Sequence, residues 1–325
     1  MWSPDVIITD GGKMAIHEDM VILTPEGEKQ LKGLKKVNQI LDASGTFRSV
    51  VATLIEDYHG YFYEFFFKCF PFTLKCNADQ MVYSVKDIGS PESDDDDAEN
   101  RPAREIKPAL VKASTVSIYE YMGMPFLQET PSLMPSGLPV DQDDFWFFMG
   151  IVLNKLSFGK PPKIEGNRVT IAIQNEENIY VKFPPGINRI PTINGVVMLS
   201  APLGAYIASV MNYPLQLLFL PKKCQSALYD GYFFYEHSKL QETDNLNVIY
   251  TMWYIYCRLN KKLGIIQASR NREYKLSIPA NPTSCVDNHM WFRITDVKVT
   301  VERAKVYHFR TEAPMVIVRN FLVKP

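Results

Sequence analysis

The sequence predicts a multi-domain protein in which an all-β domain, split along the chain, carries an inserted α/β (α+β) domain. Short apolar–polar alternations separated by turn residues fill residues 15–140 and 285–325. Residues 141–284 instead contain longer apolar runs with helical spacing around a hairpin pattern. The chain has 325 residues, 46% of them hydrophobic, which is enough for two separate cores.

Composition limits the function classes. A net charge of -1 provides no general attraction to polyanions such as nucleic acids. No apolar run reaches the roughly 18 residues that span a bilayer, and residues 1–13 carry no signal-peptide pattern. We therefore expect no membrane partner and an intracellular protein of the cytoplasm or nucleus. The five cysteines form no CxxC pair and are expected to be buried, reduced thiols that bind no metal: Cys69, Cys76, Cys224, Cys257 and Cys285.

The first β segment begins after a leader at residues 1–14. Met20–Leu41 reads as a strand, a Pro-Glu-Gly turn, a second strand and a lead into a third. Two further strands are expected in "FRSVVATLIED" and "GYFYEFFFKCF". Residues 86–108 predict a solvated acidic loop, because the like charges of Asp94–Asp97 repel one another. Four consecutive Asp lack the alternating spacing of a calcium loop, so this loop predicts no metal site.

The closing segment also reads as strands. Residues 291–310 alternate as two strands, and "VYHFRTEAPMVIVRNFLVKP" at residues 306–325 reads as two strands around a turn. Such a segment needs partner strands from the other end of the chain. Together with Met20–Leu41 and "VKASTVSIYEYMGMPF" at Val111–Phe126, it resembles the blocks of inteins, which have the Hint fold of self-splicing proteins. The resemblance implies a β horseshoe formed by both ends of the chain.

The same resemblance places the splicing groups on residues that cannot perform the chemistry. The nucleophile falls on Ala15, with His17 nearby, and alanine has no nucleophilic group. The Thr and His of the second block fall on Asn77 and Gln80, and an amide cannot shuttle a proton at neutral pH. An alternative role for both is to satisfy backbone groups in a turn. The last two positions, His and Asn in inteins, carry Lys324 and Pro325.

The inserted segment resembles a LAGLIDADG homing endonuclease. Its "DFWFFMGIVLNKLSFG" and "LPKKCQSALYDGYFFYEHS" are similar to the two signature helices, and Gly150 and Gly231 keep their places. The resemblance implies that these helices lie side by side, each with a metal-binding carboxylate. Those positions carry Lys155 and Glu236. We therefore expect no metal, no cofactor, and an attraction between the two side chains at about 4 Å.

Other elements of the insertion follow from spacing. We expect a β-hairpin at residues 163–183 and helices at 198–214 and 247–265. The candidate nucleic-acid contacts are basic residues near helix ends, where a solvated helix terminus is the alternative interpretation. These candidates are Lys222, Lys223, Arg258, Lys261, Lys262, Arg270 and Arg272.

Three hypotheses for function remain. The first is a catalytically inactive, domesticated intein with its endonuclease domain, acting as a structural or protein-interaction module with a protein partner. The second is a sequence-specific protein that binds double-stranded DNA and has lost cleavage. The third is a surviving homing endonuclease that uses Glu236 with an unrecognised second carboxylate, such as Asp143, Asp144 or Asp230.

Overall fold

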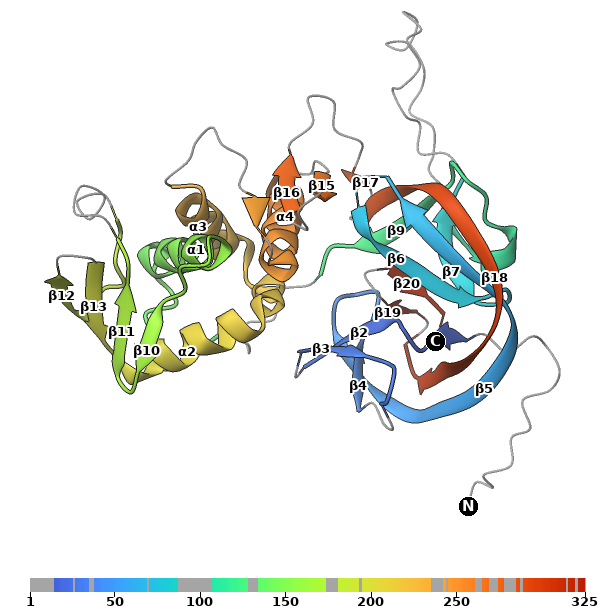
Figure 1. Ribbon diagram of the computed structural model, residues 1–325, viewed down its shortest axis with the longest axis horizontal. Helices are drawn as coiled ribbons and strands as arrows, with labels where there is room; N and C mark the ends of the chain where they lie inside the picture. The colour runs from blue at the N-terminus through green and yellow to red at the C-terminus, as the bar shows by residue number, and fades with distance from the viewer. Residues whose placement is uncertain are drawn as a thin grey trace, which may run out of the picture. The chain divides into compact units, whose positions relative to one another are not determined.

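The computed structural model has a mixed, sheet-rich fold that divides into two compact units (Figure 1). The β unit comprises Met1–Lys68, Phe72–Pro125 and Asn288–Pro325, and the helical unit comprises Cys69–Pro71 and Phe126–Asp287. The structure describes residues 15–25, 27–34, 38–68, 70–86, 107–127, 134–173, 181–192, 195–234, 242–243, 245–260, 265–268, 274–277, 285–286, 289–313, 315–318 and 321–324. The acidic stretch Asp94–Asp97 lies outside these residues. The assignment to the Hint and LAGLIDADG folds stays a prediction.

The β unit ends its second segment at Pro125, before the residue 140 at which the sequence places this boundary. The next residues already belong to the core of the helical unit. The ring of Phe126 lies 6.0 Å from that of Tyr254, and the N–H of Leu127 donates to the Tyr254 hydroxyl. The chain therefore enters the helical unit ahead of its Pro-rich stretch.

The strands of the β unit form one continuous path of pairing. Its order is β3-β2-β19-β20-β7-β9-β18-β1-β6-β5-β4, with β8 added on β7. The elements are β1 (Ile16–His17), β2 (Val21–Thr24), β3 (Gly27–Gln30), β4 (Gln39–Leu41), β5 (Phe47–Phe67), β6 (Phe70–Asn77), β7 (Met81–Val85), β8 (Ala109–Lys112), η2 (Ala113–Thr115), β9 (Tyr121–Pro125), β18 (His289–Thr311), β19 (Val316–Val318) and β20 (Phe321–Val323). The strand–turn–strand prediction for Met20–Leu41 is confirmed by the pairing of β2 with β3.

Two long strands, β5 and β18, curve together through the β unit (Figure 1). They pair antiparallel from Ile294 opposite Phe67 to Thr311 opposite Val50. The prediction of two separate strands in each of these stretches is wrong. Gly60 does not end β5, because Glu302 lies opposite it and the ladder continues on both sides.

Strands from the two ends of the chain pair with each other, as predicted. In β1, Ile16 lies opposite Tyr307 of β18, and in β2, Ile22 lies opposite Val318 of β19. The hairpin β19–β20 continues onto β7, where Val323 lies opposite Val82. Residues far apart in sequence thus meet in one sheet.

The helical unit combines four α-helices with two small sheets among its described residues. Their orders are β10-β11-β13-β12 and β14-β16-β15. The elements are α1 (Asp143–Ser157), β10 (Lys163–Glu165), β11 (Arg168–Ile171), β12 (Asn188–Thr192), β13 (Gly195–Leu199), α2 (Ala201–Asn212), η4 (Pro214–Phe219), α3 (Lys222–Tyr232), β14 (Glu242–Thr243), α4 (Leu246–Asn260), β15 (Ile265–Ala268), β16 (Tyr274–Ser277) and β17 (Cys285–Val286). The hairpin predicted at residues 163–183 is confirmed in its first part, where β10 pairs with β11 over residues 163–171.

Local sequence explains where the helices begin. The hydroxyl of Ser200 accepts a hydrogen bond from the N–H of Leu203 at 3.3 Å, which caps α2 two residues after the predicted start. In α1, residues from Phe145 to Leu153 are buried, so this helix is central to the core of the unit. The indole N–H of Trp146 in α1 donates to the carbonyl of Val140 at 2.7 Å. This hydrogen bond holds the turn that precedes the helix against it.

No helix within the described ranges is long and apolar enough to cross a membrane. Three of the cysteines, Cys76, Cys224 and Cys257, are buried and form no disulfide, as expected. Burial raises the pKa of the Cys76 thiol well above its usual range, which keeps this thiol protonated and unreactive. The side chains of Cys69 and Cys285 lie outside the described part of the chain.

Candidate functional site

The structure brings four of the predicted splicing positions together in the β unit. Ala15 precedes β1, Asn77 ends β6, Gln80 precedes β7 and Lys324 follows β20. Ala15, Asn77 and Gln80 are almost fully buried, with 1%, 2% and 1% of their surface exposed. The fifth position, Pro325, lies outside the described residues. This cluster of Ala15, Asn77, Gln80 and Lys324 is called the closure site below.

Two side-chain amides hold the closure site together. The N–H of Ala15 donates to Oδ1 of Asn77 at 3.2 Å, and the N–H of Asn77 donates back to the Ala15 carbonyl at 3.1 Å. Nε2 of Gln80 donates to the carbonyl of Lys324 at 2.7 Å and to that of Met81 at 3.1 Å. The N–H of Gln80 in turn donates to the Asn77 carbonyl at 3.3 Å. Both amides therefore satisfy backbone groups, and each fastens one terminal segment to the β6–β7 turn.

This geometry determines what the closure site can do chemically. The Ala15 side chain is a methyl group, so nothing there can attack the preceding peptide bond. The amides of Asn77 and Gln80 can donate and accept hydrogen bonds but do not titrate near neutral pH. Removing the Asn77 side chain would take the hydrogen-bond acceptor from the buried N–H of Ala15, at a cost of about 1–3 kcal/mol.

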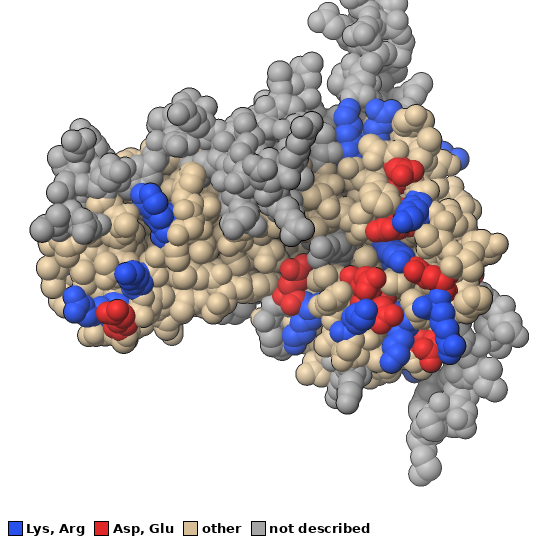
Figure 2. Space-filling view, in the orientation of Figure 1, with Lys and Arg blue, Asp and Glu red and all other residues tan. Residues whose placement is uncertain are grey.

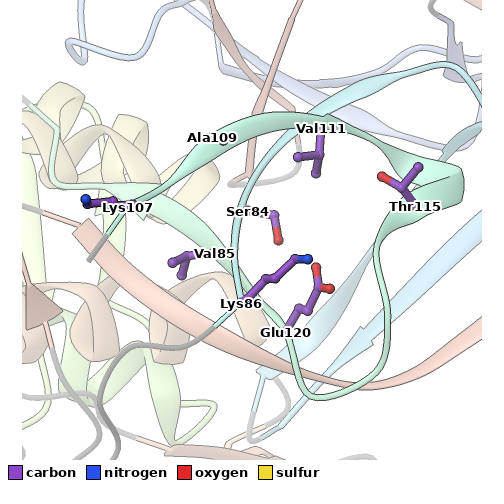
Figure 3. Close-up of a pocket in the computed structure, with 8 residues that line it drawn as sticks. All are labelled: Ser84, Val85, Lys86, Lys107, Ala109, Val111, Thr115 and Glu120. Carbon is purple, nitrogen blue, oxygen red and sulfur yellow. The ribbon is translucent and has the colours of Figure 1, made fainter. Parts of the chain in front are cut away.

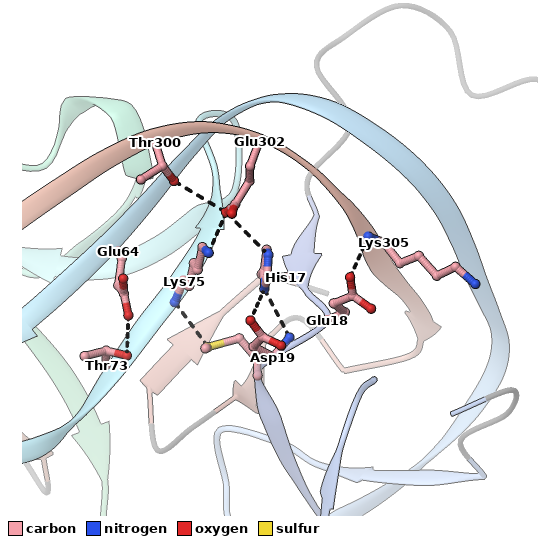
Figure 4. A network of polar contacts seen from close by, with 10 residues as sticks. His17, Glu18, Asp19, Glu64, Thr73, Lys75, Thr300, Glu302 and Lys305 are labelled. Carbon is pink, nitrogen blue, oxygen red and sulfur yellow. Dashed lines mark hydrogen bonds and ion pairs between the residues drawn. The ribbon is translucent and has the colours of Figure 1, made fainter. Parts of the chain in front are cut away.

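A cluster of ionisable groups surrounds His17, which follows Ala15 by two residues in the chain (Figure 4). His17 of β1 is 3% exposed, and its ring packs edge-on against Phe62 at 4.8 Å. Its Nδ1 accepts the N–H of Asp19 at 3.1 Å, and its Nε2 lies 3.5 Å from Oε1 of Glu302. The same Glu302 oxygen is 2.5 Å from Nζ of Lys75. We refer to His17, Lys75 and Glu302 as the His17 cluster.

The protonation states of the His17 cluster follow from its surroundings. Burial lowers the pKa of His17, and the positive charge of Lys75 lowers it further, against opposing effects of Asp19 and Glu302. For Glu302, burial favours a higher pKa, but the hydrogen bond and charge of Lys75 prevail and lower it. Because Nδ1 accepts the Asp19 N–H, the neutral imidazole carries its proton on Nε2, facing Glu302.

Sequence reasoning missed the His17 cluster. Its three members come from β1, β6 and β18, at positions 17, 75 and 302. Only the pairing of β1 between β18 and β6 brings them together. The available signal was the presence of Lys75 and Glu302 within stretches that alternate with apolar residues, where a charged side chain that turns inward needs a partner.

In the helical unit, the two predicted signature helices cross at their glycines. A methyl group on Gly150 of α1 would overlap the carbonyl oxygen of Leu228 and lie 2.6 Å from the backbone nitrogen of Tyr232. A methyl group on Gly231 of α3 would overlap the carbonyl oxygen of Phe147. The backbones of α1 and α3 are therefore in direct contact, which only glycine permits at these two positions.

Polar side chains continue this contact toward the ends of the two helices. Nδ2 of Asn154 donates to the carbonyl of Tyr232 at 2.8 Å, and the hydroxyls of Ser157 and Tyr232 lie 3.0 Å apart. Lys155 is half-buried in the last turn of α1. Its predicted partner Glu236 lies outside the described residues, so the attraction between these side chains stays a prediction.

Two of the three alternative metal carboxylates, Asp143 and Asp144, lie far from Lys155. Asp143 and Asp144 begin α1, about 18 Å along the helix axis from its last turn at 1.5 Å per residue. Asp143 is 3.2 Å from Nζ of Lys223, and Asp144 is 3.9 Å from Nζ of Lys182. Within the described ranges, no group of three or more metal-ligating side chains is close enough to hold an ion.

The predicted nucleic-acid contacts that the structure describes differ in their exposure. Arg258 is 8% exposed and turns inward, where its guanidinium donates to the Leu220 carbonyl and to Oε1 of Gln225, both at 3.0 Å. Its assignment as a DNA contact is corrected on this ground, because a buried guanidinium cannot reach a phosphate. Lys222 and Lys223 are exposed at the start of α3. The other predicted contacts, Lys261, Lys262, Arg270 and Arg272, lie outside the described residues.

The visible surface agrees with this distribution. On the face drawn in Figure 2, Lys and Arg side chains of the β unit alternate with Asp and Glu, and those of the helical unit stand apart from one another. The ion pair between Lys223 and Asp143 joins side chains that are 72% and 56% exposed, so it contributes little to stability.

Comparison with known proteins finds no matching family model and no matching curated protein.

Proposed function

We propose that this chain is a catalytically inactive module, derived from an intein with an inserted endonuclease, that acts in protein interaction. The observation that carries the proposal is the closure site. There, the positions that would polarise and attack a peptide bond carry Asn77, Gln80 and Ala15, and the two amides bind backbone groups. An arrangement that satisfies its own polar groups favours a structural role over a chemical one.

An exposed apolar patch on the long ribbon supports the interaction role. Tyr61 and Val301 lie directly opposite each other on β5 and β18, with 59% and 58% of their surface exposed. Val299, 49% exposed, follows two residues away on the same face and lies opposite Tyr63. Contiguous exposed apolar side chains of this kind mark interaction surfaces.

The chemical part of the proposal is tested by intact-mass measurement. The purified protein is incubated at pH 7 to 9 with and without hydroxylamine, which cleaves any thioester or ester intermediate. We expect one unchanged mass in every sample, and the same in Ala15→Cys, because no proton-transfer group replaces Gln80. Time-dependent fragments ending at residue 14 in the wild type would overturn the proposal.

The interaction part needs a surface variant with a matched control. We expect Tyr61→Glu combined with Val301→Glu to lose the proteins that co-purify stoichiometrically with the wild type from its own cells. Val51→Glu is the control, because Val51 is 68% exposed but lies ten residues, about 33 Å, from Tyr61 along β5. Equal recovery of partners with both variants would contradict the assignment of this patch.

A second candidate function is DNA binding without cleavage. It is favoured by the direct contact of α1 and α3 at Gly150 and Gly231, because the resemblance to LAGLIDADG homing endonucleases implies two signature helices that lie side by side. The test is a gel shift of duplex DNA over a salt series. Binding that weakens with salt, and weakens further in the double variant Lys222→Ala, Lys223→Ala, would support this candidate. Magnesium-dependent nicking of plasmid DNA would instead favour the surviving endonuclease.

A further inference from the structure

Strand β18 has a stretch of outer edge, on the side away from β5, that no strand covers among the described residues. This edge pairs with β9 at residues 289–293 and with β1 at Val306 and Tyr307. Next to β9, the N–H of Tyr119 donates to the carbonyl of Ile294, and the N–H of Ile294 donates to the carbonyl of Glu120. The open stretch therefore lies between Ile294 and the end of β1.

Hydrogen bonds near both ends of this stretch show which backbone groups point outward. The N–H of Glu18 donates to the carbonyl of Lys305 at 3.0 Å, and the N–H of Lys305 donates to Oε1 of Glu18 at 3.2 Å. At the other end, the N–H of Val297 donates to Oδ1 of Asp296 at 2.8 Å. The ladder with β5 has no register shift between Asp296 and Lys305, so every second residue from Val297 to Lys305 faces outward.

Three residues therefore turn their backbone N–H and C=O groups to the open edge: Val299, Val301 and Arg303. The two valines are 49% and 58% exposed, and the arginine is exposed as well. Within the described part of the chain, no hydrogen bond on this edge involves any of the three. An accessible row of unpaired backbone groups is a template for another strand, and strand addition is a recurrent way to bind an extended peptide.

The cavity beside the β7–β8 hairpin differs from this edge, because its polar side chains face partners within the protein (Figure 3). Its volume is about 490 Å³. Its lining residues are Ser84, Val85, Lys86, Lys107, Ala109, Val111, Thr115 and Glu120. Both hydroxyl groups donate to backbone carbonyls, Lys86 points toward Glu120, and Lys107 has a partner. The edge of β18 instead presents its donors and acceptors to solvent.

The side chains along the edge define what a bound segment needs. A strand added here places alternate side chains beside Val299, Val301 and Arg303. The two valines favour aliphatic neighbours. Arg303 lies opposite His59 of β5 and forms no ion pair with any described residue. A carboxylate beside Arg303 would therefore supply the counter-charge that β5 does not.

A second copy of the chain does not meet this need. Two copies of β18 that pair antiparallel around Val301 would place Arg303 of each beside Val299 of the other. Each guanidinium would then lie beside an aliphatic side chain, without a carboxylate. The charge at Arg303 favours a different protein as the occupant.

We propose that the outer edge of β18 at residues 299–303 binds an extended segment of a partner protein by strand addition, with aliphatic residues beside Val299 and Val301 and a carboxylate beside Arg303. The proposal rests on the proposed interaction function and names the kind of segment that binds beside Tyr61 and Val301. Antiparallel pairing is slightly more stable per residue than parallel pairing. The segment therefore has an acidic residue followed, at every second position, by two aliphatic residues.

The first experiment adds the peptide Thr-Glu-Thr-Val-Thr-Val-Thr, with blocked ends, to the wild-type protein. We expect a Kd on the order of 0.1–1 mM by calorimetry. Amide hydrogen exchange at Val299, Val301 and Arg303 should slow on binding, because these N–H groups gain acceptors. Exchange at Thr300 and Glu302, whose N–H groups face β5, should stay unchanged.

Methylation of the peptide backbone separates strand pairing from side-chain binding. N-methyl groups on the two valines remove donors that face β18 and should weaken binding about tenfold or more. N-methyl groups on the two threonines that flank the first valine are the matched control, because those N–H groups face away from β18. No binding of the unmodified peptide, or equal affinity of the two methylated peptides, would overturn the proposal.

Substitutions locate the site. Val301→Pro removes one outward N–H, which an edge strand tolerates, and should weaken peptide binding about tenfold. Val301→Thr, which keeps the N–H and the branched shape, is its control. Replacing Glu by Lys in the peptide should weaken binding to the wild type about threefold or more, and Arg303→Glu should reverse this preference. Equal binding by the two Val301 variants, or an unchanged preference in Arg303→Glu, would contradict the proposal.

The failure of strand addition can be distinguished from the failure of the interaction patch. Partners that are lost with Tyr61→Glu, Val301→Glu but retained by Val301→Pro would support the patch and overturn strand addition. Partners retained by both variants would contradict the patch itself. Self-association of the wild type in sedimentation, abolished by Val301→Pro, would overturn the proposal in favour of a second copy.

Discussion

The β unit and the helical unit join distant parts of the chain by different physical means. In the β unit, Asn77 and Gln80 connect the two terminal segments through hydrogen bonds to backbone groups. In the helical unit, Gly150 and Gly231 bring α1 and α3 together because they have no side chains. One junction depends on matched donors and acceptors, and the other on the absence of atoms.

This difference determines which substitutions each junction tolerates. A polar junction keeps its stability when a reactive side chain is replaced by an amide that makes equivalent hydrogen bonds. A glycine junction tolerates no added atom, because the opposing backbone cannot move away without breaking its own helix. We therefore expect the residues of the closure site to tolerate substitution better than the two glycines of the helix crossing.

The largest effect is expected from Gly150→Ala or Gly231→Ala. Each new methyl group would overlap a backbone carbonyl of the opposing helix. We expect the free energy of unfolding of the helical unit to fall by about 3 kcal/mol or more, measured by urea denaturation.

The matched control for these variants is Gly204→Ala in α2. The nearest atom to a methyl group there is a side-chain carbon of Ile164 at 3.3 Å, which can adjust. The change should therefore stay within about 1 kcal/mol. Because alanine favours a helix more than glycine does, helix propensity alone would stabilise all three variants, and equal losses in all three would contradict a special role of the crossing.

Arg258 extends the comparison of polar and glycine junctions, because its guanidinium makes polar contacts inside the helical unit. We expect Arg258→Met to lower the free energy of unfolding by about 2–3 kcal/mol, since the Leu220 carbonyl and the Gln225 amide oxygen lose a charged donor. Thermal and urea unfolding measure this loss. Arg168→Met should change little, because Arg168 is an exposed residue of β11. A variant as stable as the wild type would mean that the guanidinium is not held inside.

In the β unit, Gln80→Ala removes the donor to the carbonyls of Lys324 and Met81. We expect a loss of about 1–2 kcal/mol in the free energy of unfolding. The control is Gln39→Ala, because Gln39 is exposed on β4. Losses that are the same for both glutamines would argue against a special role of the closure site.

The smallest effect is a pH dependence that arises from His17. Because burial and Lys75 lower its folded pKa below 6.5, the unfolded chain binds more protons, and the free energy of unfolding falls as the pH drops from about 7 to 5. One such group changes the slope by at most about 1.4 kcal/mol per pH unit. His17→Gln should flatten this slope, whereas His59→Gln at exposed His59 should not. A slope that survives His17→Gln would assign the effect to another group.

The carboxylates of Asp42 and Glu302 affect stability in a separate, more acidic pH range. Against the effect of burial, hydrogen bonds with Arg48 and Lys75 lower the pKa values of Asp42 and Glu302. Their contribution to stability is present above about pH 4 and is lost as the pH falls below it. The His17 effect can therefore be measured without interference from them.

The sequence predicted the elements that follow simple patterns and missed those set by distant partners. Alternation and a Pro-Glu-Gly turn sufficed for β2 and β3, and an apolar run sufficed for α1. The continuity of β5 through Gly60 could not be predicted, because it depends on the ladder with β18. Likewise, Arg258 reads as a solvated helix end until the carbonyl of Leu220 is placed beside it.

For the candidate site, sequence blocks identified the positions of the closure site but not their hydrogen bonds. A side-chain amide has several possible partners, and only the fold selects the Ala15 N–H for Asn77. The His17 cluster had no sequence signal strong enough to connect its three strands.

The central claim is that the closure site binds backbone groups. Amide hydrogen exchange at Ala15 tests it most directly, because this N–H donates to Oδ1 of Asn77. We predict slow exchange in the wild type and exchange about tenfold or more faster in Asn77→Ala, with the Ile22 amide of β2 unchanged. Exchange at Ala15 that is equally fast in both proteins would contradict the claim.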